Sequence, residues 1–141
     1  MKPFRIQFLG IRTAPEAMGL WREMGLEKWA EDRVERQHHW GEETVHLRIS
    51  HEVFSAPKYL NVRLDPSISE PRATHIGMRA TPEEAEEWRT FFSARGIPIR
   101  EEYRTVAHTN INRRFHDIYF ATAAILGVDV EISVEIPNDA G

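Results

Sequence analysis

The segment GIRTAPEAMGLWR, residues 10–22, decides the fold, because a related segment, GMRATPEEAEEWR, follows at residues 77–89. Aligned at an offset of 67 residues, they share six of 13 positions: Gly, Arg, Pro, Glu, Trp and a second Arg. Pro and Glu are common in any first helical turn, but helix capping does not explain the shared Gly and Trp. Such self-similarity marks a duplicated architecture. We therefore expect one domain, residues 1–141, made of two modules at approximately 1–68 and 72–137.

The first copy of the repeat begins as a strand. Residues 4–12 alternate in character, which places Phe8, Gly10 and Arg12 on one strand face and Gln7 on the other. A helix is expected to follow, with Thr13 as its N-cap.

The second copy predicts a helix that Thr81 caps and that ends near Gly96, about one turn longer than the first. Its apolar side chains recur at helical spacing, which favours packing onto a sheet: Ala85, Trp88, Phe91 and Phe92.

Three strands are expected after each helix. They cover residues 28–34, 44–51, 58–65, 97–106, 115–122 and 128–136. The element order is β-α-β-β-β, twice, with a hairpin connection at 55–57 and a linker at 67–73. The predicted fold class is α+β, with two tandem β-α-β-β-β modules that form a cupped mixed sheet with helices on the outer face.

Composition excludes several classes of function. The formal net charge is −4 and no long basic block is present, so nucleic acid is not an expected partner. The 141 residues include no cysteine, so any metal must be held by His, Asp, Glu or similar oxygen donors. No apolar stretch approaches the ~20 residues that a membrane span needs. We expect a soluble, cytoplasmic protein with no membrane partner.

Two further segments carry a family resemblance. THIGMRA, residues 74–80, and DIYFATAAILGVDVEI, residues 117–132, resemble the vicinal oxygen chelate superfamily of glyoxalases, extradiol dioxygenases, methylmalonyl-CoA epimerases and bleomycin resistance proteins. Through the duplicated element order, the resemblance covers nearly the whole chain. It implies a cupped sheet, frequent pairing into homodimers, and a divalent metal ion or an apolar ligand inside the cup.

The resemblance also implies metal ligands. A His that opens a module and a Glu near its final strand match His75 and Glu131 in the second module. In the first module the repeat places Phe8 at the position of His75, whereas a shift by one residue selects Gln7. The implied ligands are therefore His75, Glu131 and Gln7, and Glu131 is also the candidate catalytic base. Burial in an apolar cup would raise its pKa, whereas a metal ion or an Arg would lower it.

The first-module counterpart of Glu131 is Asn61 or Arg63, depending on one gap. Neither is a carboxylate. Because a catalytic site normally needs about three protein ligands, a third donor is required beyond the pair in the second module. The candidates are Gln7, Asn61, and a histidine elsewhere, such as His108 or His116.

Two arginines, Arg12 and Arg79, occupy equivalent positions in the two copies. If an approximate twofold axis relates the modules, both guanidinium groups lie near the rim of the cup and suit a carboxylate or phosphate. The competing interpretation is that each pairs with a helix residue, Glu16 or Glu83.

The strand RFHDIYFA, residues 114–121, adds two candidates for ligand binding, His116 and Tyr119. Alternation puts His116 on one face and Asp117 and Tyr119 on the other. Only one set can face the cup, and the pattern does not select between them. The expected ligand-binding set is Phe8, Arg12, Asn61, Arg79, His116 and Tyr119.

These observations favour an enzyme: a metal-dependent lyase, isomerase or epimerase that acts on a small, oxygen-rich and acidic molecule. A dioxygenase ranks lower, because such a site uses two His and one Glu and the first module lacks its His. The alternative is a metal-free small-molecule-binding protein that resembles the drug-sequestering bleomycin resistance proteins. A third option is a module that has lost its chemistry and binds a partner.

Overall fold

The computed structural model describes residues 1–25, 30–38, 41–52, 59–68, 70–108 and 114–137, so the hairpin connection predicted at 55–57 lies outside the described residues. The first module contains β1 (Phe8–Thr13), the 3-10 turn η1 (Pro15–Ala17), α1 (Met18–Glu23), β2 (Ala30–His38), β3 (Gly41–Glu52) and β4 (Tyr59–Leu64). The second contains β5 (Arg72–Ala80), α2 (Pro82–Ser93), β6 (Ile99–His108), β7 (Arg114–Phe120), α3 (Ala123–Leu126) and β8 (Asp129–Ile136).

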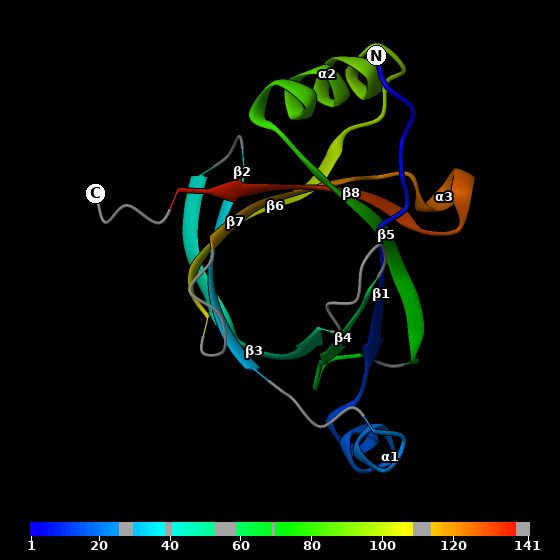
Figure 1. Ribbon diagram of the computed structural model, residues 1–141, viewed down its shortest axis with the longest axis vertical. Coiled ribbons are helices and arrows are strands. Elements are labelled where there is room, and N and C mark those ends of the chain that lie inside the picture. The colour runs from blue at the N-terminus through cyan, green and yellow to red at the C-terminus, as the bar shows by residue number, and fades with distance from the viewer. Residues whose placement is uncertain (26–29, 39–40, 53–58, 69, 109–113, 138–141) are drawn as a thin grey trace.

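The strands close into a barrel in the order β1-β4-β3-β2-β6-β7-β8-β5 (Figure 1). Each module supplies four neighbouring strands, with one parallel pair, β1 with β4 or β5 with β8. The modules join through two antiparallel pairs, β1 with β5 and β2 with β6. The predicted α+β fold of repeated β-α-β-β-β units is confirmed, and the expected cup is closed within a single chain.

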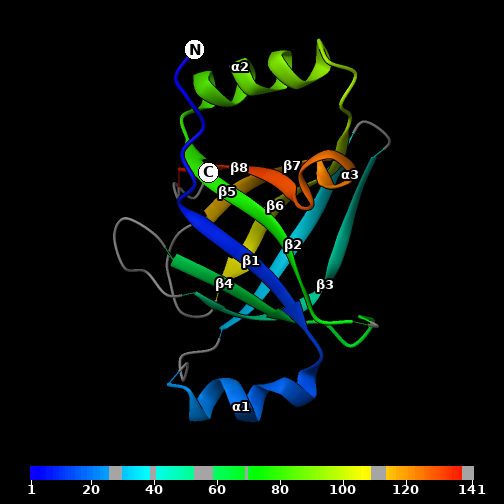
Figure 2. The same ribbon diagram turned by 90° about the vertical axis from the view of Figure 1, so that its right-hand side faces the viewer.

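The two longer helices lie outside the barrel on opposite sides (Figure 2). Thr81 begins α2 as predicted: its side chain accepts a hydrogen bond from the Glu84 amide, and the Glu84 carboxylate accepts one from the Thr81 amide. Such a capping box satisfies two amide groups that a helix start otherwise leaves unpaired. The buried face of α2 packs against β5, β7 and β8 in one hydrophobic core: Met78, Ala85, Trp88, Phe92, Ile118, Phe120, Val130 and Ile132.

The first helix begins differently from the prediction. Thr13 is not its N-cap, because Thr13 is the buried last residue of β1 and its hydroxyl accepts a hydrogen bond from Trp21 Nε1 at 3.3 Å. Ala14 precedes the 3-10 turn and makes no side-chain capping bond. The result is a short α1 that buries none of its own residues. None of the helices in the described part of the chain is long and apolar enough to cross a membrane.

The packing of β1 against β5 explains why both modules have a glycine at the equivalent position. In the β1–β5 pair, Gly10 is opposite His75 and Phe8 is opposite Gly77, so each module contributes one ring and one glycine. A Cβ atom on Gly10 would lie 1.9 Å from His75 Cε1, and one on Gly77 would lie 2.1 Å from Phe8 Cε2. Each ring therefore packs directly against a glycine of the other module, where no side chain intervenes.

Candidate functional site

The inner wall of the barrel holds the predicted imidazole and carboxylate side by side. His75 of β5 and Glu131 of β8 are each 4% exposed, and His75 Nε2 lies 3.0 Å from Glu131 Oε1. On its other side, His75 Nδ1 is 3.0 Å from the hydroxyl of Thr74. Strand alternation produces this arrangement, because Val130 and Ile132 pack outward in the core under α2 while Glu131 points inward.

The contact between His75 and Glu131 brings a buried nitrogen and a buried carboxylate oxygen to a spacing that also suits two ligands of one ion. Despite the 3.0 Å separation, His75 Nε2 has no aligned hydrogen-bond partner among the described residues. Protein nitrogen and oxygen atoms bind a divalent ion at about 2.0–2.2 Å, so two ligands at a right angle stand about 3 Å apart. The pair therefore fits two adjacent coordination positions of one metal ion.

Strand register identifies the first-module counterpart of Glu131. Gly10 of β1 pairs with Asn61 of β4, just as Gly77 of β5 pairs with Glu131 of β8. Asn61 is therefore the first-module counterpart of Glu131, and Arg63 is the counterpart of Ser133, two residues further along β8. Asn61 is buried and shares one row across the sheet with Gly10 and His75. Because the imidazole lies over Gly10, it leans toward the strand that carries Asn61, whose amide oxygen is the third candidate donor.

Gln7 does not join this group. Its Oε1 atom accepts a hydrogen bond from the Arg79 backbone amide at 2.5 Å, along the junction between β1 and β5. Phe8, at the position equivalent to His75, is buried and supplies no donor atom. Within the described ranges, no group of three or more His, Cys, Asp or Glu side chains is placed so that it could hold a metal ion. Any ion site here depends on one amide in addition to His75 and Glu131.

Tyr119 and Arg63 complete the wall beside His75. The Tyr119 ring meets the imidazole edge to face at 5.1 Å between centroids, and its hydroxyl accepts a 2.9 Å hydrogen bond from Arg63 Nη2. Burial alone would lower the pKa of Arg63, but neighbouring Tyr119, Glu131 and Asp117 raise it above its ordinary value. A permanent cation therefore lies inside the barrel, joined to the phenol.

Glu131 is held in its ionised form. Burial acts to raise its pKa, but the contact with His75 and the charges of Arg63 and Arg79 outweigh burial and lower the pKa to about 2. An ionised carboxylate suits a metal ligand. A proton acceptor for catalysis near neutral pH needs a higher pKa, so this environment favours the ligand role over the base role.

Arg79 is enclosed in the barrel rather than placed at a rim. Its guanidinium carbon lies 3.9 Å from the Phe115 ring centroid and 5.3 Å from that of Phe8, and the group donates to the Ser133 hydroxyl. Ser133 in turn donates to Asp117 Oδ1 at 2.6 Å. The predicted symmetric pair of rim arginines is therefore not formed, because Arg79 fills the half of the interior that lies beside Phe8.

Asp117 is the second carboxyl group of the interior. Burial, together with the negative charge of Glu131, raises its pKa to about 7, although Arg79, Ser133 and Arg63 oppose that rise. The barrel thus contains two carboxyl groups whose pKa values are displaced in opposite directions, an arrangement typical of sites that handle protons.

The structure selects between the two faces of β7. Asp117 and Tyr119 point into the barrel, whereas His116 points out, with its Nε2 atom 3.4 Å from Glu102 Oε1. Glu102 also contacts Arg89 of α2, which confirms that this is the outer, helix-covered face. The placement of His116 in the ligand-binding set is therefore wrong, because alternation turns it away from His75.

A pocket of about 340 Å³ opens beside His75. Its lining combines cations, carboxylates, an imidazole and a phenol: Arg12, Arg72, Ala73, Thr74, His75, Arg100, Glu101, Tyr119, Ala123, Gly127 and Asp129. Arg12 lines this pocket, and its nearest described carboxylate is Asp65, at 3.7 Å, rather than Glu16. The structure thus brings Arg12, His75 and Tyr119 together around one cavity.

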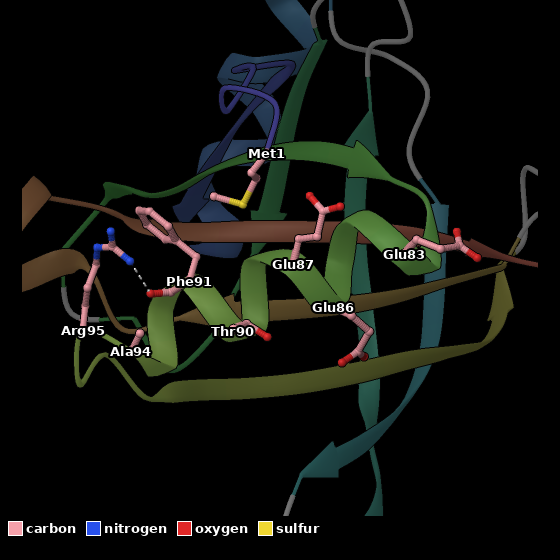
Figure 3. A pocket seen from close by; sticks show the side chains of 8 residues that line it. All are labelled: Met1, Glu83, Glu86, Glu87, Thr90, Phe91, Ala94 and Arg95. Carbon is pink, nitrogen blue, oxygen red and sulfur yellow. Dashed lines mark hydrogen bonds between the residues drawn. The ribbon is translucent and has the colours of Figure 1, made fainter.

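A larger, shallower hollow of about 640 Å³ runs along the outer face of α2 (Figure 3). Its floor contains Phe91, whose carbonyl accepts a 2.8 Å hydrogen bond from Arg95, with Met1 above the helix. The remaining lining is mostly acidic and solvated, and neither an imidazole nor a phenol contributes to it. The smaller pocket is therefore the candidate functional site.

Several site residues were not selected from the sequence: Arg63, Thr74, Arg72, Arg100, Glu101, Asp117 and Ser133. A signal existed for two of them. Ser133 lies two residues after Glu131, and Asp117 lies two residues before Tyr119, so alternation places both on the inner face with their neighbours. The others depend on pairing between distant strands.

Comparisons with known proteins place this architecture in a class. No protein-family model and no curated protein matches the chain. Solved structures do match over nearly the whole chain, and they include methylmalonyl-CoA epimerases, one of the groups that the sequence resembles.

Several of these structures are methylmalonyl-CoA epimerases. The Mycobacterium tuberculosis enzyme is 13% identical, with a TM-score of 0.52 over 94% of this chain and 88% of that chain. A variant from Streptomyces coelicolor, in complex with 2-nitronate-propionyl-CoA, is 13% identical, with a TM-score of 0.55 over 96% and 100%. A hypothetical protein from Bacillus halodurans C-125 is 9% identical, with a TM-score of 0.53 over 94% and 95%. At such identities the likeness shows the fold alone.

Proposed function

We propose that this protein is a glyoxalase-like enzyme of the isomerase or epimerase type, which moves a proton at a carbon next to a carbonyl group of a small acidic molecule. The observation that carries the proposal is the buried pair of His75 and Glu131, whose Nε2 and Oε1 atoms lie 3.0 Å apart beside a pocket lined by three arginines. The arginines suit an acidic substrate, and the pair suits the oxygen atoms that gain charge during the reaction.

A divalent ion fits the donors at this site. His75, Glu131 and Asn61 would hold it, and an imidazole with oxygen donors suits Zn, Fe, Mn, Co or Ni. When bound, such an ion polarises a substrate carbonyl and stabilises the negative oxygen that forms after loss of the adjacent proton. Phe8, at the first-module position equivalent to His75, supplies no donor atom, so any further ligand of such an ion would have to be water or substrate.

The chain's own residues supply binding and proton transfer. Glu101 lines the pocket and is paired with Tyr119 across β6 and β7, with its carboxylate accepting a hydrogen bond from the Tyr103 hydroxyl. We assign Glu101 as the proton acceptor, because Glu131 is held at a low pKa by its neighbours. Tyr119, which accepts a hydrogen bond from Arg63, faces the same pocket and can donate its own proton to a substrate oxygen.

Methylmalonyl-CoA, whose methylmalonyl group is the small acidic part, is the first substrate to test, because one structural neighbour is an epimerase in complex with it. The protein, purified without a polyhistidine tag and without chelator, would be analysed for metal and incubated with methylmalonyl-CoA in D₂O. Stoichiometric metal and deuterium uptake at the carbon between the two carbonyl groups, both lost in His75→Ala, support the proposal. Retention of both in His75→Ala contradicts it.

The alternative is a metal-free small-molecule-binding protein. Its specific support is the aromatic interior, in which Phe8 takes the place of a donor and Tyr103 packs against Tyr119 at 5.9 Å between ring centroids. Tight binding of apolar aromatic compounds by chelator-treated protein, with no metal recovered, favours this function.

The proposed functional form is a cytoplasmic homodimer, in keeping with the resemblance. Native mass spectrometry of the untagged protein tests the dimer, which is contradicted if the protein stays monomeric at micromolar concentration.

A further inference from the structure

The entrance to the pocket contains an unusual pair of like charges. In the β1–β5 ladder, Arg12 is directly opposite Arg72, and both line the pocket that His75 borders. Side chains at directly opposed positions of an antiparallel pair have Cβ atoms about 4.5–5.5 Å apart, and like charges there are destabilising. Two facing guanidinium groups beside a candidate active site indicate that an anion belongs between them.

A local irregularity in β5 creates this pair. Gly10 is paired with His75, but Ile11 is paired with Ala73, so Thr74 is an extra residue in β5. Without it, Arg12 would face Ala73. The bulge shifts the register by one residue and so turns Arg72 to the side of Arg12, and bulges of this kind commonly re-aim side chains next to active sites. Thr74 also contacts His75 Nδ1, so one bulge positions both the imidazole and the arginine.

The other charges of the pocket leave Arg72 available. Arg100 is held by Asp129 at 2.6 Å, and Arg12 lies 3.7 Å from Asp65. Arg72 is exposed and has no ion pair in the described part of the chain. A ligand that neutralises Arg72 therefore displaces little existing structure.

We propose that Arg12 and Arg72 form an anion clamp for a second acidic group of the substrate, so that the substrate is a small dianion. This inference rests on the proposed function, in which the first set of oxygen atoms lies at His75 and Glu131. Arg12 is two residues from Gly10, over which the imidazole lies, a distance of about 6–7 Å along an extended strand. A short dicarboxylate or a phosphorylated carboxylic acid spans that distance, and a guanidinium fork binds either terminal group.

The test is a set of calorimetric titrations with three probes. Glutarate and 2-phosphoglycolate carry two acidic groups, whereas butyrate carries one and has a similar size to glutarate. The wild-type protein is expected to bind at least one dianion about tenfold or more tightly than butyrate, a difference of about 1.4 kcal/mol. The dicarboxylate and phosphate arms show which terminal group the clamp prefers. Equal affinity for all three probes, or no binding of either dianion, overturns the proposal.

Arg72→Gln is the decisive variant, and Arg22→Gln on the exposed face of α1 is its charge-matched control. Arg72→Gln is expected to lose the preference for dianions, whereas Arg22→Gln retains it. Without ligand, Arg72→Gln should unfold at the same or a higher temperature, because the facing charge of Arg12 is relieved. An unchanged preference in Arg72→Gln, or a clear loss of its ligand-free stability, overturns the clamp.

Failure of the clamp can be separated from failure of the proposed function. Metal content and deuterium exchange with methylmalonyl-CoA report on the His75 site, whereas binding of glutarate or 2-phosphoglycolate by chelator-treated protein reports on the arginines. If the dianion preference persists after chelation and in His75→Ala, it supports the clamp even where no deuterium exchange with methylmalonyl-CoA is found. If metal and exchange persist in the wild type while no dianion preference exists, the clamp alone is wrong.

Discussion

Gly10→Ala tests directly how the fold builds the site. The added Cβ would lie 1.9 Å from His75 Cε1 and 2.2 Å from Nε2. An ordinary carbon contact is about 3.5 Å, so the imidazole must retreat by roughly 1.5 Å. It cannot do so freely, because Thr74, Glu131 and Tyr119 enclose it. Overpacking of this kind costs about 1–3 kcal/mol.

The expected result is a free energy of unfolding lower by about 1–3 kcal/mol, together with weaker uptake of Zn²⁺ or Co²⁺. The stability is measured by urea denaturation, and ion uptake by calorimetry on chelator-treated protein. Movement of the imidazole by more than 1 Å changes the 3.0 Å spacing of Nε2 and Glu131 Oε1, and two ligands of one ion must keep a fixed spacing.

Two further glycines provide controls. Gly77→Ala places a Cβ 2.1 Å from the Phe8 ring, and its nearest neighbours are Phe8 atoms rather than His75 atoms, so it should destabilise the protein while ion uptake persists. Gly19 of α1 has open space around its Cα, so Gly19→Ala should stabilise the helix by about 0.5–1 kcal/mol. The reasoning is refuted if Gly10→Ala retains wild-type stability and ion affinity, or if Gly77→Ala loses ion uptake to the same extent.

Three other predictions follow from the structure. The pKa of Asp117 is raised to about 7 in the folded state, so the wild-type protein loses stability as the pH rises from about 4 to 7. Asp117→Asn removes this loss. Denaturation at pH 5 and pH 8 should therefore show that the free energy of unfolding of the variant, relative to the wild type, increases by on the order of a few kcal/mol between the two pH values. Thr81→Ala breaks the capping box and should lower the free energy of unfolding by about 1 kcal/mol at pH 7, as measured with urea, without changing ion uptake. Phe8→His introduces an imidazole at the position equivalent to His75 and should strengthen Co²⁺ binding in a titration; unchanged affinity would show that this position does not reach the ion.

The pattern of neighbouring residues in the sequence was enough to predict several elements of this fold. The pattern of residues 128–136 predicted the last strand, the shared Gly and Trp of the repeat predicted two modules, and Thr81 marked the start of α2. These features could be predicted because strand and helix periodicities depend on neighbouring residues alone. His75 and Glu131 were paired through the family resemblance, and the structure places them in contact.

Only the tertiary structure decided the rest. A bulge at Thr74 turns Arg72 toward Arg12, strand register selects Asn61 over Arg63 as the counterpart of Glu131, and packing beneath α2 turns His116 outward. Bulges, gaps and the choice of inner face arise from pairing and packing between segments far apart in the chain. Because a one-residue change of register reverses every side chain that follows it, no local pattern contains this information.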